Sequence, residues 1–222
     1  MIAFAAASRG DNFGCWIKGK LEGMAAKPPP KRDTFRHGNL PEALVRAALS
    51  RLQAGGVESI SLRDLAADVG VNHRAVYRHF PDKLSVLACA AEHAWQQFGQ
   101  RVKKSTAGKA PGEEVLIAAS LSLFAFAREF PNLYHLMAGE RVNLQGKFPK
   151  LEAAVFDALQ VFAVGFAGTG MAPGIVVGRT AIYVAALQGV ITQILYRRLH
   201  VTPAKANSYL ADICKMLIKG IG

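Results

Sequence analysis

The sequence predicts an all-α fold. Ala, Leu and Val recur at the spacing of a helical face through most of the 222 residues, while the alternating β-branched runs typical of strands are missing. Gly and Pro interrupt these apolar stretches at short intervals. Together the observations predict helices joined by tight connections, with the first helices much shorter than the later ones.

Two short helices are expected first. One follows Asn39, where Glu42 three residues on indicates a capping box, and it stops at Gly55. The next opens at Ser61, whose hydroxyl can cap the amide of Asp64. Apolar residues line one face of each helix, so both are expected to pack together.

A third short helix is expected from Asn72 to about Phe80, before longer helices begin. The long helices are predicted over 83–104, 112–129, 149–167, 174–199 and 203–219. Their apolar residues cover more than one face, which indicates burial inside a bundle. The expected domains are a disordered basic tail at 1–36, a three-helix domain at 37–83 and a helical bundle domain at 84–222.

Composition restricts the class of protein. The formal net charge is +11, which favours an anionic partner such as nucleic acid or an anionic membrane surface. The three cysteines include no C-x-x-C pair and no His at metal-ligand spacing, so we expect a reducing cytoplasm and no metal site. Signatures such as G-x-S-x-G and H-E-x-x-H are missing from the sequence, so we expect neither an enzyme nor a cofactor.

The basic, proline-rich segment before residue 37 has two interpretations. Lys27, Lys31, Arg32 and Arg36 can form a flexible arm that touches phosphates or the minor groove, or they can be a plain solvated tail. Met24 precedes this segment directly, so translation can begin there or at the first residue.

Two apolar stretches raise the question of membrane spans. Residues 158–178 reach the roughly 20 uncharged residues that a span needs, but their many Gly residues fit an interhelical loop better. Residues 180–196 are shorter and contain Gln188, Thr192 and Gln193. A buried dimer interface is therefore expected ahead of a membrane partner.

The stretch 61–80 has the spacing of a helix-turn-helix motif. Ala66 supplies a small residue where two helices approach each other, and Gly70 supplies the left-handed turn that reverses the chain. Val71 and Val76 close the small core. The third helix is therefore expected to face outward.

Polar and basic side chains gather on this outward helix and beside it. Asn72, His73 and Arg74 stand at its N-terminal end, where such motifs meet base edges in the major groove, and Arg74 suits guanine. The predicted phosphate contacts are Ser61, Arg63, Tyr77, His79 and Lys83. Tyr77 can instead be a packing residue, and both histidines can be ordinary surface residues.

The run Tyr-Arg-His-Phe-Pro-Asp-Lys at 77–83 is specific. Together with His37-Gly-Asn-Leu-Pro-Glu-Ala-Leu and Ser61-Leu-Arg-Asp-Leu-Ala before it, this run resembles the DNA-binding head of the tetracycline-repressor (TetR) family over about residues 37–90. Leu84 departs from the family pattern, in which an acidic residue commonly follows the lysine. The run 130–137 is similar to the start of the effector domain in one subgroup.

This resemblance implies a homodimer whose two heads each read half of a near-palindromic double-stranded DNA operator, joined through the last two long helices as a four-helix bundle. In the subgroup a later helix tends to carry a His-Gly pair, whereas this chain has Gln188-Gly189. The sequence itself favours close helix contact, because small and apolar residues share one stripe: Ile182, Ala185, Ala186, Gly189, Val190 and Gln193.

The predicted function is a ligand-responsive repressor, in which an unidentified small-molecule effector shifts the spacing of the heads and releases DNA. Helix 83–104 is the expected lever. The predicted effector contacts are Trp95, Phe98, Phe124, Tyr134, Met137, Phe156, Phe162 and Gln188, any of which can instead be ordinary core packing. The alternative function is a nonspecific basic DNA- or membrane-surface-binding protein, whose binding ignores sequence and vanishes as salt rises.

Overall fold

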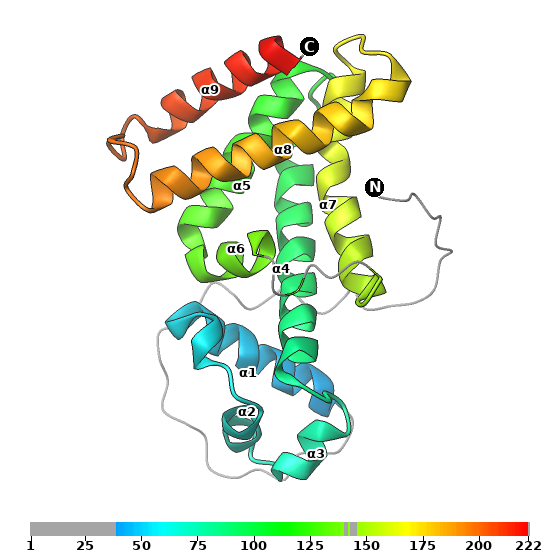
Figure 1. The fold of residues 1–222 in the computed structure, drawn as a ribbon, viewed down its shortest axis with the longest axis vertical. Coiled ribbons are helices and arrows are strands. Elements are labelled where there is room, and N and C mark those ends of the chain that lie inside the picture. Colours follow the sequence, from blue (N-terminus) through cyan, green and yellow to red (C-terminus); the bar gives the residue numbers. More distant parts are fainter. Residues whose placement is uncertain (1–38, 140–141, 143–145, 222) are drawn as a thin grey trace. The chain divides into compact units, whose positions relative to one another are not determined.

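The structure, a computed structural model, describes residues 39–139, 142 and 146–221. Within these ranges the chain forms nine α-helices and one short 3-10 helix and no strand, which confirms the predicted all-α class (Figure 1). The predicted tail at 1–36 lies outside the described residues. Residues 37–222 form one compact unit.

The first helices are α1 (Leu40–Gly55), α2 (Leu62–Val69) and α3 (His73–Tyr77), with the 3-10 turn η1 (Val57–Ser59) after α1. Their shared core consists of Leu44, Ala48, Leu52, Leu65, Val76 and Phe80, all of them buried. A helix as short as α3 is unstable alone, because too few hydrogen bonds offset the cost of nucleation. Burial of an apolar side chain stabilises by about 1.5–3 kcal/mol, so packing of α3 on this core keeps it folded.

Side-chain caps begin two of the helices. Asn72 caps α3 as predicted, because its side-chain oxygen accepts a hydrogen bond from the amide of Arg74 at 2.9 Å. Asp82 caps α4 (Lys83–Thr106) by accepting from the Ser85 amide at 2.7 Å. The starts of α3 and α4 are thus both fixed by local hydrogen bonds.

Two other predicted caps are wrong. Asn39 donates its amide to the Glu42 carboxylate and does not accept from the backbone of α1. The Ser61 hydroxyl makes no cap hydrogen bond to the described residues, and only its carbonyl joins the helix, accepting from Leu65 at 3.0 Å. Both helices are held by burial of their apolar faces.

The remaining helices are α5 (Glu113–Glu129), α6 (Pro131–Ala138), α7 (Pro149–Ala167), α8 (Pro173–Leu195) and α9 (Ala206–Ile221). Helix α4 contacts α1 at one end and α5, α6 and α7 along its length, so one continuous helix joins the head to the bundle (Figure 1). Helices α4 and α7 pack against each other at Gly99 and Ala158, where a Cβ on Gly99 would make an ordinary contact at 3.6 Å. Helix α4 begins at Lys83 and continues across the predicted domain boundary between residues 83 and 84.

Helix α6 is absent from the predicted elements. Pro131 is predicted to be a break between helices, whereas α6 begins at this residue. Proline is favoured at the first helical position, where its missing N–H leaves no bond unmade. The same side chain therefore ends α5 and starts α6.

Helix α8 presents unusually apolar surface. Among the described residues it is the single helix whose length and composition would be sufficient to cross a membrane, and 28% of its most apolar stretch is buried within the chain. Ile175, Val177 and Ile182 on this helix are exposed. A buried core helix would have these side chains covered, so α8 has a face that the single chain leaves open.

Candidate nucleic-acid interface

The turn between α2 and α3 determines how the third helix is presented. Gly70 has φ +75° and ψ 29°, a left-handed conformation that favours glycine. A Cβ at Gly70 would meet no atom within 4 Å, so backbone conformation and not space requires the glycine there. The amide of Val71 donates to the Ala66 carbonyl at 2.9 Å, which closes the turn and confirms the predicted reversal.

Helix α2 is fixed to α1 by one arginine that the sequence analysis does not identify. The Arg51 guanidinium donates to both carboxylate oxygens of Asp68, with the Nη2 to Oδ1 distance at 2.8 Å, and lies 3.8 Å from Asp64. The hydrogen bonds from Arg51 hold the pKa of Asp68 below its ordinary value. A two-pronged arginine–carboxylate pair also fixes orientation, so α2 cannot rotate on α1 without breaking it.

Helix α3 buries one side and exposes the other. Val76 is fully buried and Ala75 is half-buried, whereas His73, Arg74 and Tyr77 are exposed, with Tyr77 at 53%. The predicted outward orientation of this helix is therefore what the structure has. Tyr77 is not a core residue.

The cap at Asn72 limits what its side chain can offer to a partner. The carboxamide oxygen already accepts from the Arg74 amide, which leaves the NH₂ group as a free donor. Arg74 itself has an exposed side chain with five donors. The N-terminal end of α3 thus presents donors from Asn72 and Arg74, which match acceptor-rich guanine edges and phosphates.

The other predicted phosphate contacts surround α3. Arg63 at the start of α2 and His79 after α3 are exposed, while Ser61 and Lys83 are half-buried at their helix starts. Arg78, which the sequence analysis omits, is exposed beside them. Its place directly after the helix, in a turn, gives no periodic signal in the sequence.

Asp82 is an acidic group close to this basic surface. Its carboxylate accepts from the Ser85 amide at 2.7 Å and from the Ser85 hydroxyl at 2.6 Å. These hydrogen bonds hold the pKa of Asp82 below its ordinary value, so the group is ionised at neutral pH. The Asp82 carboxylate therefore caps the N-terminus of α4.

Six of the eight predicted effector contacts are buried in the bundle: Trp95, Phe98, Phe124, Tyr134, Met137 and Phe162. Gln188 is half-buried, and its carbonyl accepts from the Tyr134 hydroxyl at 3.1 Å. Phe156, on the outer side of α7, is 39% exposed. None of the eight residues lines the cavity of about 230 Å³ beside α4 and α7 or that of about 140 Å³ beside α6.

The bundle interior contains polar groups that the sequence analysis does not identify. The Ser120 and Tyr183 hydroxyls lie 2.8 Å apart and join α5 to α8, and burial raises the pKa of Tyr183 far above its ordinary value. Trp95 Nε1 is buried with no hydrogen-bond partner among the described residues. A donor in this state costs free energy until an acceptor reaches it.

Helices α2 and α3 are joined by a glycine turn, pack on α1 and expose hydrogen-bond donors. This arrangement defines the chain as a helix-turn-helix DNA-binding regulator. The family model of bacterial regulatory proteins, tetR family, matches residues 44–88. Residues 44–88 are therefore a TetR-family DNA-binding head, the family that the sequence motifs predict. The family is one of transcriptional regulators and not of enzymes.

Similar proteins extend the comparison beyond the head. The nucleoid occlusion factor SlmA of Sodalis glossinidius is 30% identical over 134 residues, 58% of this chain and 65% of that protein. The SlmA of Edwardsiella ictaluri is 29% identical over 147 residues, 62% of this chain and 71% of that protein.

Solved structures share the whole fold. A Rhodococcus sp. RHA1 protein of unknown function is 21% identical with a TM-score of 0.70, covering 85% of this chain and 98% of its own. A TetR variant from Acinetobacter baumannii AYE, in complex with minocycline, is 18% identical with a TM-score of 0.61, covering 86% and 96%. At these identities the likeness shows the fold alone.

Proposed function

We propose that the protein is a ligand-responsive transcriptional repressor that binds a near-palindromic operator as a homodimer in the cytoplasm and is released by a small-molecule effector. The observation that carries the proposal is the donor-rich, exposed side of α3, braced by a buried Val76 and by the Arg51–Asp68 pair. In this assignment residues 37–83 read DNA, and residues 84–222 bind the effector and the second subunit.

The DNA contacts divide into two groups. Arg74, with Asn72 and His73 beside it, reads base edges, and a two-pronged arginine–guanine contact discriminates by about 1–3 kcal/mol. The phosphate contacts are Ser61, Arg63, Tyr77, Arg78, His79 and Lys83, which fix the register on the duplex and supply salt-dependent affinity.

The homodimer forms through α8 and α9. Ile182 is 58% exposed and Met216 is 68% exposed, values that suit side chains covered by a partner rather than by water. Ala185 and Gly189 are exposed beside Ile182, and such small residues let two helices approach closely. Two copies of this face meeting around a two-fold axis give a four-helix bundle.

The effector binds among the aromatic side chains of the bundle. Trp95 Nε1 is a buried donor that lacks an acceptor, and Tyr134 with Gln188 provides a polar contact between α6 and α8. Because α4 carries Trp95 and Phe98 and continues into the head, a displacement of these side chains moves α4 and changes the spacing of the two recognition helices.

Selection of duplexes from a random pool tests the proposal. Wild-type protein should enrich a two-fold symmetric sequence, with half-sites about one helical turn apart. Arg74→Ala should lose this enrichment, whereas Lys104→Ala, a matched exposed basic residue on α4, should keep it. Binding that shows no sequence preference and disappears as salt rises would support the nonspecific basic protein instead.

A second function follows from the relatives named for nucleoid occlusion. The bundle interior is densely filled, with Phe98, Phe162 and Tyr134 almost inaccessible, which suits a DNA-binding protein that needs no effector. Mapping the binding sites along the chromosome separates the two functions. A repressor should occupy few promoters, and a nucleoid occlusion factor should occupy many dispersed sites.

A further inference from the structure

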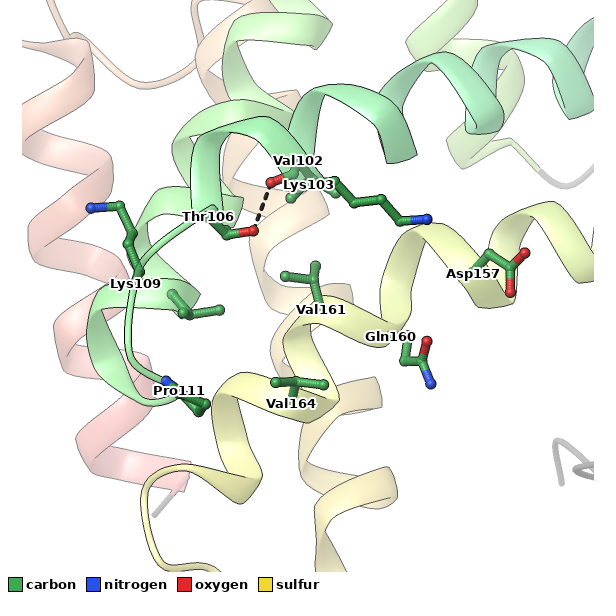
Figure 2. A pocket seen from close by; sticks show the side chains of 10 residues that line it. Val102, Lys103, Thr106, Lys109, Pro111, Asp157, Gln160, Val161 and Val164 are labelled. Atoms are coloured by element: carbon green, nitrogen blue, oxygen red, sulfur yellow. Dashed lines mark hydrogen bonds between the residues drawn. The ribbon is translucent and has the colours of Figure 1, made fainter. Parts of the chain in front are cut away.

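The cavity of about 230 Å³ lies where α4 ends, α5 begins and α7 passes both, away from the predicted effector contacts (Figure 2). Its floor is apolar, since Val102 and Val115 are 1% and 4% exposed. Val161 and Val164 line it from α7. The volume holds roughly eight waters at about 30 Å³ each, so it suits a small metabolite and not a drug-sized ligand.

Two charges of opposite sign stand at the rim. Lys103 extends from α4 toward the side of the cavity where Asp157 lies on α7 (Figure 2). Neither side chain has an ion-pair partner within the described part of the chain. Both charges are therefore available to a ligand.

Two other polar side chains of the rim, Lys109 and Thr106, are already engaged. The Lys109 ammonium pairs with Glu114 and points away from the cavity, and the Thr106 hydroxyl donates to the Val102 carbonyl at 2.8 Å (Figure 2). This leaves one cation, one anion and the uncharged amide of Gln160 above an apolar floor. A simple anion would meet repulsion from Asp157, and a simple cation would meet repulsion from Lys103.

We propose that this cavity binds a small zwitterion with an aliphatic body, of the class of aliphatic α-amino acids. The ligand carboxylate pairs with Lys103, its ammonium pairs with Asp157, and its side chain lies on the valine floor. Charge-assisted contacts supply specificity, and burial of the aliphatic part supplies affinity. The site is separate from the DNA interface and from the predicted effector contacts.

Calorimetric titration of the full-length protein, without DNA, tests the site with four probes. L-leucine carries both charges and the aliphatic body, 4-methylpentanoate lacks the ammonium, 3-methylbutylamine lacks the carboxylate, and glycine lacks the aliphatic body. Leucine should bind at one site per chain, and each of the other three should bind at least tenfold more weakly. Equal affinity for leucine and either single-charge probe would overturn the proposal.

Substitutions locate the binding. Lys103→Met and Asp157→Asn should each weaken leucine binding at least tenfold, while Lys104→Met, the adjacent lysine that does not line the cavity, should leave it unchanged. Both positions are exposed, so the fold should persist, and unaltered thermal unfolding checks this. The proposal is overturned if the three variants bind alike, or if leucine gives no heat up to about 10 mM, beyond the millimolar range of weak ligands. Because DNA is absent, either result leaves the proposed repressor function untouched.

Discussion

Helices α3 and α8 both turn one side outward, but the two exposed sides differ in chemistry. The outer side of α3 has donors and charges, with His73 and Arg74 exposed. The outer side of α8 has aliphatic side chains, including Ile175, Val177 and Ile182. Exposure alone does not say which partner a helix binds. The chemistry of the exposed side chains does: donors and charges suit an anionic duplex, whereas aliphatic side chains suit another apolar helix.

The two helices also differ in what holds them. The five-residue helix α3 depends on a cap, a left-handed glycine and one buried valine, so its position is fixed by its neighbours. The 23-residue helix α8 has enough hydrogen bonds and buried contacts of its own, through Tyr183, Leu187 and Ile191. Substitutions around α3 should therefore affect DNA binding locally, whereas substitutions on α8 should affect assembly.

The largest loss of DNA affinity is expected from a substitution on the apolar face of α8. Ile182→Lys places a charge in the proposed α8–α9 interface, which should convert the dimer to monomer. DNA affinity should then fall by about two orders of magnitude, because the second head no longer benefits from attachment to the first. Light scattering after size exclusion and DNA titration measure both. Ala125→Lys on the exposed side of α5 is the matched control. An equal loss of DNA affinity in both variants would show that the α8 face is not the dimer interface.

A substitution on the polar face of α3 should reduce DNA affinity by an amount that depends on the DNA sequence. Arg74→Lys keeps the positive charge but loses the two-pronged donor set, so affinity for the selected duplex should fall by roughly 10- to 100-fold, about 1–3 kcal/mol. Affinity for random duplex should change little. Fluorescence anisotropy with both duplexes measures the ratio, and a uniform loss on the two would assign Arg74 to phosphate.

The start of α4 joins the two regions and predicts a pH dependence. Hydrogen bonds from Ser85 lower the pKa of Asp82, so its stabilising contribution is present above the unfolded pKa of about 3.9 and is lost as pH falls through the lower folded pKa. Asp82→Ala should cost about 1 kcal/mol at pH 7. Urea unfolding should show the wild-type and variant stabilities converging below about pH 4; a gap that persists there would contradict the cap.

The smallest effect is expected where α6 meets α1. The Asn132 amide donates to the Gln53 carbonyl at 3.1 Å, an exposed bond worth about 0.5–1.5 kcal/mol, with the lower end expected in water. Asn132→Ala should therefore reduce the free energy of unfolding by about 0.5 kcal/mol and leave DNA affinity unaltered. A loss of DNA affinity in equilibrium titration would mean that this bond also sets the position of the head.

The sequence predicts the head well because its signals are local. Gly70, the cap at Asn72 and the buried Val76 each depend on residues a few positions away, and periodicity reports them directly. Helix α6 is missed because a proline at the first position of a helix has the same appearance in sequence as a proline that breaks one.

The remaining features depend on tertiary contacts. Arg51 and Asp68 are 17 residues apart, and Ser120 and Tyr183 are 63 apart, so no spacing rule connects either pair. Phe156 satisfies the aromatic criterion for an effector contact yet lies on the outer side of α7, because its helix turns that position toward solvent. The cavity at Lys103 and Asp157 requires the packing of α4 on α7, which no single-helix pattern describes.

The central claim is that α3 enters the major groove as one of a two-fold related pair. Methylation interference on the selected duplex tests it directly, since methylation of guanine N7 blocks the major-groove edge. The account predicts two clusters of interfering guanines about one helical turn apart, both lost in Arg74→Ala. Interference only from minor-groove adenine methylation, or from none of the bases, would contradict it.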